Sequence, residues 1–497
     1  MNIVYFKELK KYSIKEIGEK LKINDPEEKS RVIRKLKECQ ILKAVRKDSA
    51  DLNFLLNSDI VPGDTIDDSV VYEFDYVGII VFKNYVINCF PKYFVKEESD
   101  GQTVGSKLQA KFKQVIQVIE KYNRKKRKNN YRFNLTDGRG GEITNEIGLK
   151  VFLLREFYQR GLYKKDREVI EDNGAGEIMW EETLEQPGFY KNGKVFHVPL
   201  KTLLIEEDHN YFTELHRCIL TDISQDFSRQ GLCDVFNIAP VFLSNLSLER
   251  FDNRVEHIKY MLKREFKVQF VTWKQNLLRA LYTYVEVTKT KRAIDHVELF
   301  GTNCFYLIWE DVCKTILHDK LNEPLKNLPG CNFKLDKKLS DVIMRPVWKN
   351  ETENKEDCSS GTFKPDIIGI FEKKLIIFDA KYYCCEFNDD KIKNQPGVED
   401  IAKQYLYELA FTDFAVSNSY NITQNIFLFP SDRETVLIGN ANIEILNRLN
   451  EIRVKEIKAV KLRAETAYDV YLNDLGKNGN KVSNLVREEL KKTEIEL

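Results

Sequence analysis

Two acids and a lysine near the carboxyl end of the chain are the residues best suited to chemistry. Asp366 precedes a short apolar run, and a second apolar run ends at Asp379, Ala380 and Lys381. Hydrolysis of a phosphodiester adds an oxygen nucleophile to an anionic phosphate, which carboxylates acting alone would repel. A divalent metal held by Asp366, Asp379 and the backbone carbonyl of Ala380 would supply positive charge and lower the pKa of water. The residue types therefore predict metal-dependent phosphodiester hydrolysis.

The expected metal is Mg2+, with Mn2+ as a substitute, because Mg2+ prefers hard oxygen ligands and keeps some of its waters. Lys381 could orient the attacking water or stabilise the charge that develops on the phosphate. An alternative stays open on these residues alone, since acids and lysines are abundant in this chain. The same pattern fits an ordinary hairpin that carries a surface aspartate and a solvated Asp-Lys pair.

The flanking pattern predicts the elements that would position these side chains. Residues 367–371 and 375–378 are rich in Ile and Phe and are separated by charged residues, which indicates two adjacent buried strands. Alternation along the second strand places positions 379 and 381 on one face. A helix is predicted over residues 399–409 and a strand over 425–430. Upstream, residues 305–317 predict a helix with one buried face, from which Glu310 could point toward the hairpin as a third acid.

At these residues the chain resembles the PD-(D/E)xK nuclease superfamily, and within it the nuclease subunits of McrBC-like restriction systems of the LlaJI type. The resemblance rests on three islands: FGTNCFYLIWEDVC, FKPDIIGIF with IIFDAKYY, and Gln404-Tyr405. Residues 173–180 also look like a Gly-rich element of these proteins, although Ala175 and Met179 depart from it and leave the role of this loop open. Residues 78–93 look like their amino-terminal sheet.

The resemblance implies a role for each matching residue. Asp366 and Asp379 match the metal-binding acids, Lys381 the catalytic lysine, Glu310 the acid on the first core helix and Gln404 the glutamine found near the site. It implies an endonuclease subunit that cleaves foreign double-stranded DNA. The nuclease domain could also self-associate.

The resemblance further implies a separate partner, an McrB-like AAA+ GTPase, because this sequence contains no GxxxxGK[ST] phosphate loop. Two alternatives stay open. One is a repair or recombination nuclease of the same superfamily, and the other is a non-catalytic DNA-binding scaffold.

The organisation predicted for the 497 residues is a mixed α+β multidomain protein of the α/β class. Residues 1–65 are expected to form a winged-helix-like module, because Ser13 and Glu16 form a capping box before a first helix and a second, basic helix follows. Residues 66–284 are expected to form a mixed α+β region that docks the partner or contacts DNA. Residues 285–497 are assigned to the nuclease domain.

Two groups of exposed cations are candidates for contact with DNA phosphates. The first group could equally be the solvated face of a protein adaptor, and the second could be a solvated loop. The first group is Arg31, Arg34 and Lys35, and the second is Arg124, Lys125, Lys126, Arg127 and Lys128.

Composition limits the remaining possibilities. A formal net charge of +1 argues against a histone-like binder, although it permits a basic groove beside an acidic metal site. The 10 cysteines lack Cys-x-x-Cys spacing, so reduced thiols are expected rather than a zinc site. The six histidines show no metal-ligand spacing. No apolar window is long enough for a membrane span, so the expected location is the cytoplasm.

Overall fold

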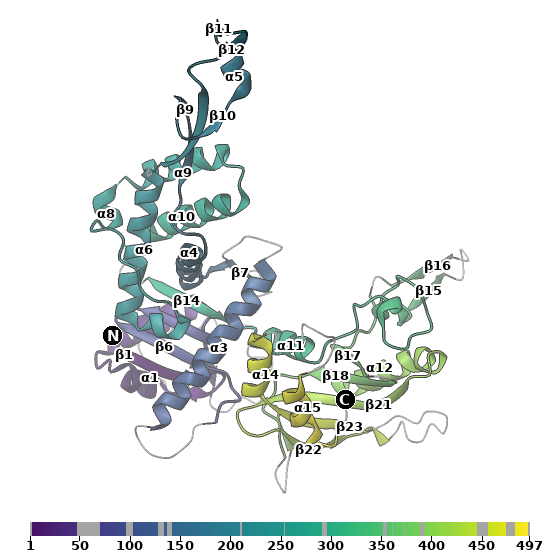
Figure 1. The fold of residues 1–497 in the computed structure, drawn as a ribbon. Coiled ribbons are helices and arrows are strands. Elements are labelled where there is room, and N and C mark those ends of the chain that lie inside the picture. The colour runs from purple at the N-terminus through teal and green to yellow at the C-terminus, as the bar shows by residue number, and fades with distance from the viewer. Residues whose placement is uncertain are drawn as a thin grey trace. The chain divides into compact units, whose positions relative to one another are not determined.

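The protein was analysed as a computed structural model, in which the described residues contain both helices and strands, as the α/β class predicts (Figure 1). They divide into two compact units. The first consists chiefly of Thr144–Leu299, and the second of Asn2–Val81, Tyr85–Ile143 and Phe300–Leu497. The predicted domain limits at residues 65 and 284 stay predictions. The described residues are 2–46, 70–95, 103–127, 134–136, 142–208, 211–252, 254–290, 296–350, 355–359, 361–371, 373–387, 392–444, 456–473 and 483–495.

The first unit is built on long helices. Helix α4 (Glu146–Arg160) begins after Asn145, whose side chain accepts a hydrogen bond from the Gly148 N–H. Helix α6 (Tyr211–Gln230) buries apolar residues at helical spacing, which explains its position in the core. The other helices are α5 (Trp180–Leu184), α7 (Leu232–Phe236), α8 (Leu248–Phe251), α9 (Val255–Val268) and α10 (Thr272–Thr290).

A projecting set of strands in this unit carries apolar side chains on its surface. The three-stranded sheet has the order β10-β13-β9, and a separate hairpin pairs β11 with β12. Trp180 is 60% exposed and Tyr190 is 74% exposed, although large aromatic side chains are usually buried. The strands are β9 (Lys165–Asp172), β10 (Glu177–Ile178), β11 (Phe189–Lys191), β12 (Lys194–Phe196) and β13 (Lys201–Asp208).

The second unit begins with strands β1 and β2, after which come two helices, α1 and α2, and strand β3. The capping box at Ser13 is confirmed, because its side chain accepts from the Glu16 N–H and Glu16 accepts from the Ser13 N–H. Two sheets follow the orders β2-β4-β3 and β1-β6-β5-β14. The elements are β1 (Asn2–Lys7), β2 (Lys11–Tyr12), α1 (Ile14–Leu21), α2 (Pro26–Glu38), β3 (Leu42–Arg46), β4 (Val70–Phe74), β5 (Val77–Phe82), β6 (Tyr85–Phe90) and β14 (Val297–Thr302), of which residues 297–299 belong to the first unit.

Helix α3 (Thr103–Arg127) carries most of the second group of cations. It extends through Arg124, Lys125, Lys126 and Arg127, so this part of the basic run is helical rather than a loop. Lys128 lies outside the described residues. Lys and Arg are good helix formers, which explains why the helix includes these positions.

The carboxyl-terminal sheet carries the predicted site. Its order is β17-β18-β21-β23-β22, in which β18 is antiparallel to β17 and parallel to β21. Helix α12 contacts β18 and β21, whereas α14 and α15 contact β23 (Figure 1). The main elements are α11 (Phe305–Ile316), β17 (Ile367–Phe371), β18 (Lys374–Ala380), α12 (Val398–Ser417), β21 (Asn421–Ser431), β22 (Val436–Ala441), β23 (Ile457–Arg463), α14 (Ala464–Leu472) and α15 (Asn484–Lys491).

The face of this sheet toward α12 is apolar in its middle. Ile368, Ile370 and Ile377 form one buried cluster with Phe411 and Phe414 of α12. Because side chains two residues apart share a face of a strand, positions 379 and 381 continue the face that Ile377 occupies. The polar site therefore lies where this apolar face ends.

Short elements complete the described structure. None of the described helices is both long and apolar enough to cross a membrane. The short elements are β7 (Asn134–Thr136), β8 (Glu142–Thr144), η2 (Leu325–Asn327), η3 (Leu339–Val342), β15 (Val347–Asn350), β16 (Lys355–Cys358), β19 (Glu386–Phe387) and β20 (Ile392–Lys393).

Candidate active site

The hairpin of β17 and β18 brings the two predicted aspartates together. Ile367 pairs with Phe378, so Asp366 and Asp379 occupy facing positions just beyond this pair. The Ala380 N–H donates a hydrogen bond to Asp366 Oδ2 at 3.1 Å, which fixes one carboxylate against the end of β18. Two acids are thereby held side by side at one edge of the sheet.

The electrostatic consequence is a raised pKa at Asp366. Burial is the largest cause, followed by the Asp379 carboxyl group, and Glu310 adds to the effect; together they raise the pKa of Asp366 to about 8. The Asp366 carboxyl group therefore favours its protonated form. A divalent cation fits such a place, because it would replace the proton and neutralise both carboxylates.

Gln404 holds the second aspartate from α12. Its side-chain Nε2 donates to Asp379 Oδ2 at 2.8 Å, and both side chains are buried. The backbone carbonyl of Gln404 accepts a hydrogen bond from Asn425 Nδ2 at 3.0 Å, which ties this part of α12 to β21. Among the described residues, Gln404 Oε1 has no hydrogen-bond partner, so this buried oxygen can accept from a ligand.

Lys381 lies between two carboxylates. Its Nζ is 3.1 Å from Asp379 Oδ1 and 2.9 Å from Asp400 Oδ1. Burial opposes the charged form, but the charges of Asp379 and Asp400 outweigh it and raise the pKa of Lys381 above its ordinary value. The lysine is therefore a fixed positive charge at the end of β18.

One backbone carbonyl aligns the three segments that carry this chemistry. The Leu428 carbonyl on β21 accepts from the Lys381 N–H at 2.9 Å and from Trp309 Nε1 at 3.1 Å. Trp309 precedes Glu310 on α11, so the helix of the third acid and the strand of the lysine meet at the same oxygen. The Glu310 side chain forms an ion pair with Lys314, one helical turn further along.

The structure adds residues that the sequence did not single out. Asp400 lies one helical turn before Gln404, a spacing that could have indicated a shared face. Lys314 follows Glu310 at the same spacing. Asp319 Oδ1 accepts from the Leu321 and Ile368 N–H groups, both at 3.0 Å, and thereby holds the start of β17. Burial raises the pKa of Tyr407 to about 12, with Asp379 as the next cause.

Several of the described cations that are predicted to contact DNA lie on the surface of the second unit. Arg34, Arg124 and Lys126 are exposed. Two members of the groups have acidic partners, since Lys35 pairs with Glu38 at 2.9 Å and Lys125 pairs with Asp311 at 2.6 Å. Contact of any of these cations with DNA stays a prediction.

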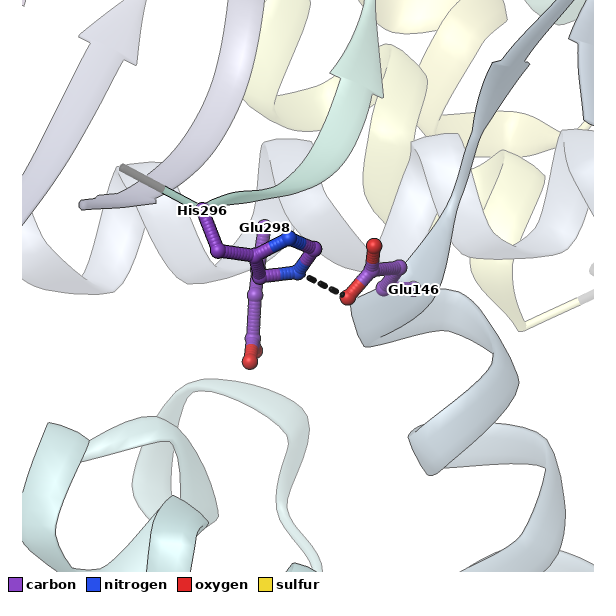
Figure 2. A group of neighbouring side chains, drawn as sticks. All are labelled: Glu146, His296 and Glu298. Atoms are coloured by element: carbon purple, nitrogen blue, oxygen red, sulfur yellow. Dashed lines mark hydrogen bonds and ion pairs between the residues drawn. The ribbon is translucent and has the colours of Figure 1, made fainter. Parts of the chain in front are cut away.

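The first unit contains a separate group of ionisable side chains (Figure 2). The possible ligand atoms of Glu146, His296 and Glu298 all lie within 4.8 Å of one another. The sequence indicated no such grouping, because Glu146 is far from the other two along the chain. His296 Nε2 and Glu146 Oε2 are 2.7 Å apart, as the dashed line in Figure 2 shows.

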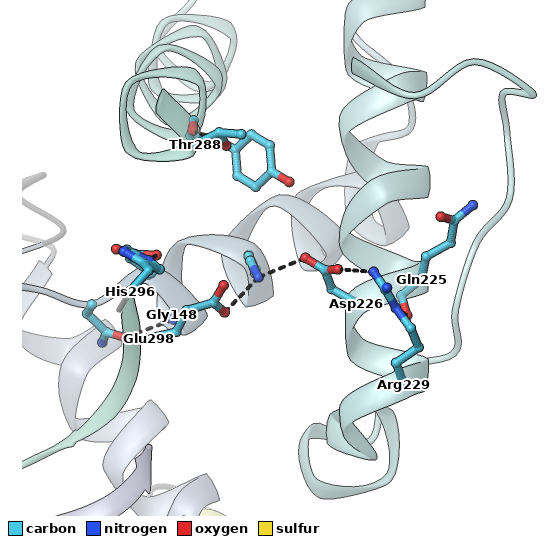
Figure 3. Close-up of polar contacts among 11 residues, drawn as sticks. Gly148, Gln225, Asp226, Arg229, Thr288, His296 and Glu298 are labelled. Atoms are coloured by element: carbon cyan, nitrogen blue, oxygen red, sulfur yellow. Dashed lines mark hydrogen bonds and ion pairs between the residues drawn. The ribbon is translucent and has the colours of Figure 1, made fainter. Parts of the chain in front are cut away.

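This second group is already supplied with positive charge. Lys150 Nζ is 2.7 Å from Glu298 Oε2 and 3.2 Å from Asp226 Oδ2. Asp226 in turn pairs with Arg229 at 2.6 Å, so the ion pairs continue outward from Glu298 (Figure 3). The lysine occupies the place beside Glu298 that a cation would need. We therefore regard this group as a buried ion-pair network.

Comparison with known proteins assigns the chain to a family. Residues 76–465 match the LlaJI restriction endonuclease family, and the chain belongs to it. It is therefore a nuclease of a restriction system, a class that implies use of a divalent metal. The match covers the hairpin, α11 and Gln404.

The individual proteins that match this chain share little sequence identity with it. The chain is 26% identical over 457 residues to the Type II restriction enzyme BsuMI component YdjA of Bacillus subtilis (strain 168), which covers 87% of each chain. McrC bound to McrB AAA+ hexamers of Thermococcus gammatolerans matches with 14% identity and a TM-score of 0.37, covering 95% of this chain and 99% of the other. A second structure, the Thermococcus gammatolerans McrBC complex, matches with 14% identity and a TM-score of 0.26, covering 64% and 88%.

Proposed function

We propose that this chain is the Mg2+-dependent endonuclease subunit of a restriction system and hydrolyses phosphodiester bonds of foreign double-stranded DNA. The observation that carries the proposal is the pair of facing carboxyl groups, Asp366 and Asp379, with Lys381 beside them. The positive charge near these two carboxyl groups does not balance their negative charge, as the raised pKa of Asp366 indicates. Mn2+ is expected to substitute, because it also accepts oxygen ligands.

The residues divide into holding and reacting groups. Asp366, Asp379 and the Ala380 carbonyl would hold the cation, and Glu310 would complete the acidic side of the site. The cation would supply positive charge to the phosphate and acidify the attacking water. Gln404 fixes the orientation of Asp379 through its 2.8 Å hydrogen bond.

Lys381 supports the attack of water on phosphorus. Its ammonium group can donate to the incoming water oxygen or to a non-bridging phosphate oxygen. The attacking water gives up a proton to solvent as its oxygen forms the new P–O bond, the bond from phosphorus to the bridging 3′ or 5′ oxygen breaks, and that oxygen leaves with a proton from solvent. Because Lys381 is positively charged and held by two acids, it acts as a donor in this step rather than as a base.

We further propose an McrB-like AAA+ GTPase as the partner that drives cleavage. The sequence has no phosphate loop of its own. The β11–β12 hairpin and α5 expose Tyr190, Trp180 and Leu184, which together offer an apolar surface for protein contact. Self-association through the nuclease domain and contact of DNA with the cations of α2 and α3 are further parts of the proposal.

Plasmid cleavage tests the function directly. Wild type should cut in Mg2+ when an McrB-like GTPase and GTP are present, whereas Asp379→Asn should not. Asp413→Asn is a matched control, because this exposed acid of α12 has no ion pair among the residues that the structure describes. Cleavage without GTPase and GTP would favour an autonomous nuclease, such as a repair enzyme. No cleavage under any condition would favour the scaffold.

A further inference from the structure

Asp400 is the second carboxylate on the ammonium group of Lys381. The two partners of this lysine come from different elements, since Asp379 lies on β18 and Asp400 lies in the first turn of α12. The Nζ–Oδ1 distances are 3.1 Å to Asp379 and 2.9 Å to Asp400. Lys381 is therefore not held by the candidate metal ligand alone.

The double pairing matters because a divalent cation and an ammonium group compete for the same carboxylate oxygen. A cation that binds Asp379 Oδ1 must displace or repel the Lys381 ammonium group, since both are positive. Asp400 provides a second carboxylate with which the Lys381 ammonium group can stay paired when a cation binds Asp379. The same helix also orients Asp379, because Gln404 lies one turn after Asp400 and donates to the other Asp379 oxygen.

We propose that Asp400 is a positioning residue that keeps Lys381 at the site while Asp379 takes up the divalent cation. The inference rests on the metal site of the proposed function. When Asp400 loses its charge, Asp379 becomes the remaining carboxylate partner of Lys381 in the described structure, and the lysine competes more strongly with the cation. Apparent metal affinity should then fall, and Lys381 should be less well placed for the reaction.

Asp400 also has an ordinary structural role that the test must separate. An acid in the first turn of a helix interacts favourably with the helix dipole. Glu399 occupies the same turn of α12 and is exposed. In the described part of the chain, the carboxylate partners of Lys381 are Asp379 and Asp400 and not Glu399, so Glu399→Gln removes the same charge from the helix end without changing the lysine.

The experiment is calorimetric titration of the full chain with Mn2+, without DNA. Asp400→Asn should raise the dissociation constant for Mn2+ roughly three- to fivefold, the upper part of the range expected for loss of one partly exposed ion pair. Glu399→Gln should leave it within about twofold, and Asp400→Glu should restore part of the loss. In a Lys381→Met background, the effect of Asp400→Asn should shrink to less than about twofold, because the competing ammonium group is gone.

Two outcomes would overturn the inference. Either Asp400→Asn binds Mn2+ as Glu399→Gln does, or its effect persists in full when Lys381 is Met. If Asp400→Asn does not fold, Asp400→Glu in both backgrounds provides the same comparison. Failure of the proposed function looks different: wild type and Asp379→Asn would then bind Mn2+ equally.

At saturating Mn2+ with DNA, Asp400→Asn should lower kcat more than it changes KM, and Asp400→Glu should recover part of kcat.

Discussion

The two units each contain a buried group of ionisable side chains, but charge is arranged differently in them. In the first unit, Glu298 faces Lys150 and Glu146 faces His296, so each acid has a basic neighbour. In the second unit, Asp366 faces Asp379 and its pKa is raised to about 8. Removing one partner of a buried ion pair is costly because the other charge stays buried, whereas facing acids cost stability until a cation arrives. The contrast separates a structural cluster from a candidate metal site.

The largest expected effect is on cleavage. Asp379→Asn should reduce the rate by about a thousandfold or more, because it removes a proposed metal ligand while preserving the side-chain shape. The melting temperature of this variant should not fall, because the substitution removes the repulsion between two facing acids. Cleavage kinetics and a thermal melt on the same preparation measure both quantities. A large loss of folding would show that Asp379 is structural.

The opposite result is expected for the network of the first unit. Lys150→Met should lower the free energy of unfolding by about 3–5 kcal/mol, because it leaves Glu298 buried without its cation. Denaturant unfolding measures this change. Arg217→Met is the control, since the Arg217–Glu214 pair is partly exposed and should contribute about 1 kcal/mol or less. Equal losses in the two variants would contradict the comparison.

The pH dependence of the metal-free protein gives a smaller effect of defined sign. The pKa of Asp366 rises from 3.8 to about 8 on folding, so between these values the unfolded chain has released a proton that the folded chain keeps. The free energy of unfolding therefore falls as pH rises through this window. Asp366→Asn cannot ionise and should melt higher than wild type in EDTA, with a larger gain at pH 8 than at pH 5. A gain that is independent of pH would remove this explanation.

The smallest effect is a shift in melting temperature on adding Mn2+. A cation that binds the folded protein raises its stability by mass action. Wild type and His296→Gln should both show the increase, whereas Asp379→Asn should not. An increase that depends on His296 would instead place a cation at the Glu146–His296–Glu298 group.

Local patterns predicted the elements of the site well. The hairpin, the helix of Glu310 and the helix of Gln404 follow from apolar periodicity, and the structure places Gln404 against Asp379. Asp400 and Lys150 were missed because periodicity reports which face of an element is apolar, not which polar partner it meets. The meeting of His296 with Glu146 joins distant parts of the chain. No spacing rule along the sequence could indicate it.

The shared acceptor at Leu428 has a consequence for how this site can vary. Its oxygen belongs to the main chain, so substituting the side chain at position 428 does not remove the contacts to Lys381 and Trp309. The alignment of α11, β18 and β21 at the site therefore depends on an atom that every amino acid has. It constrains the backbone at position 428 and leaves the choice of side chain there to packing alone.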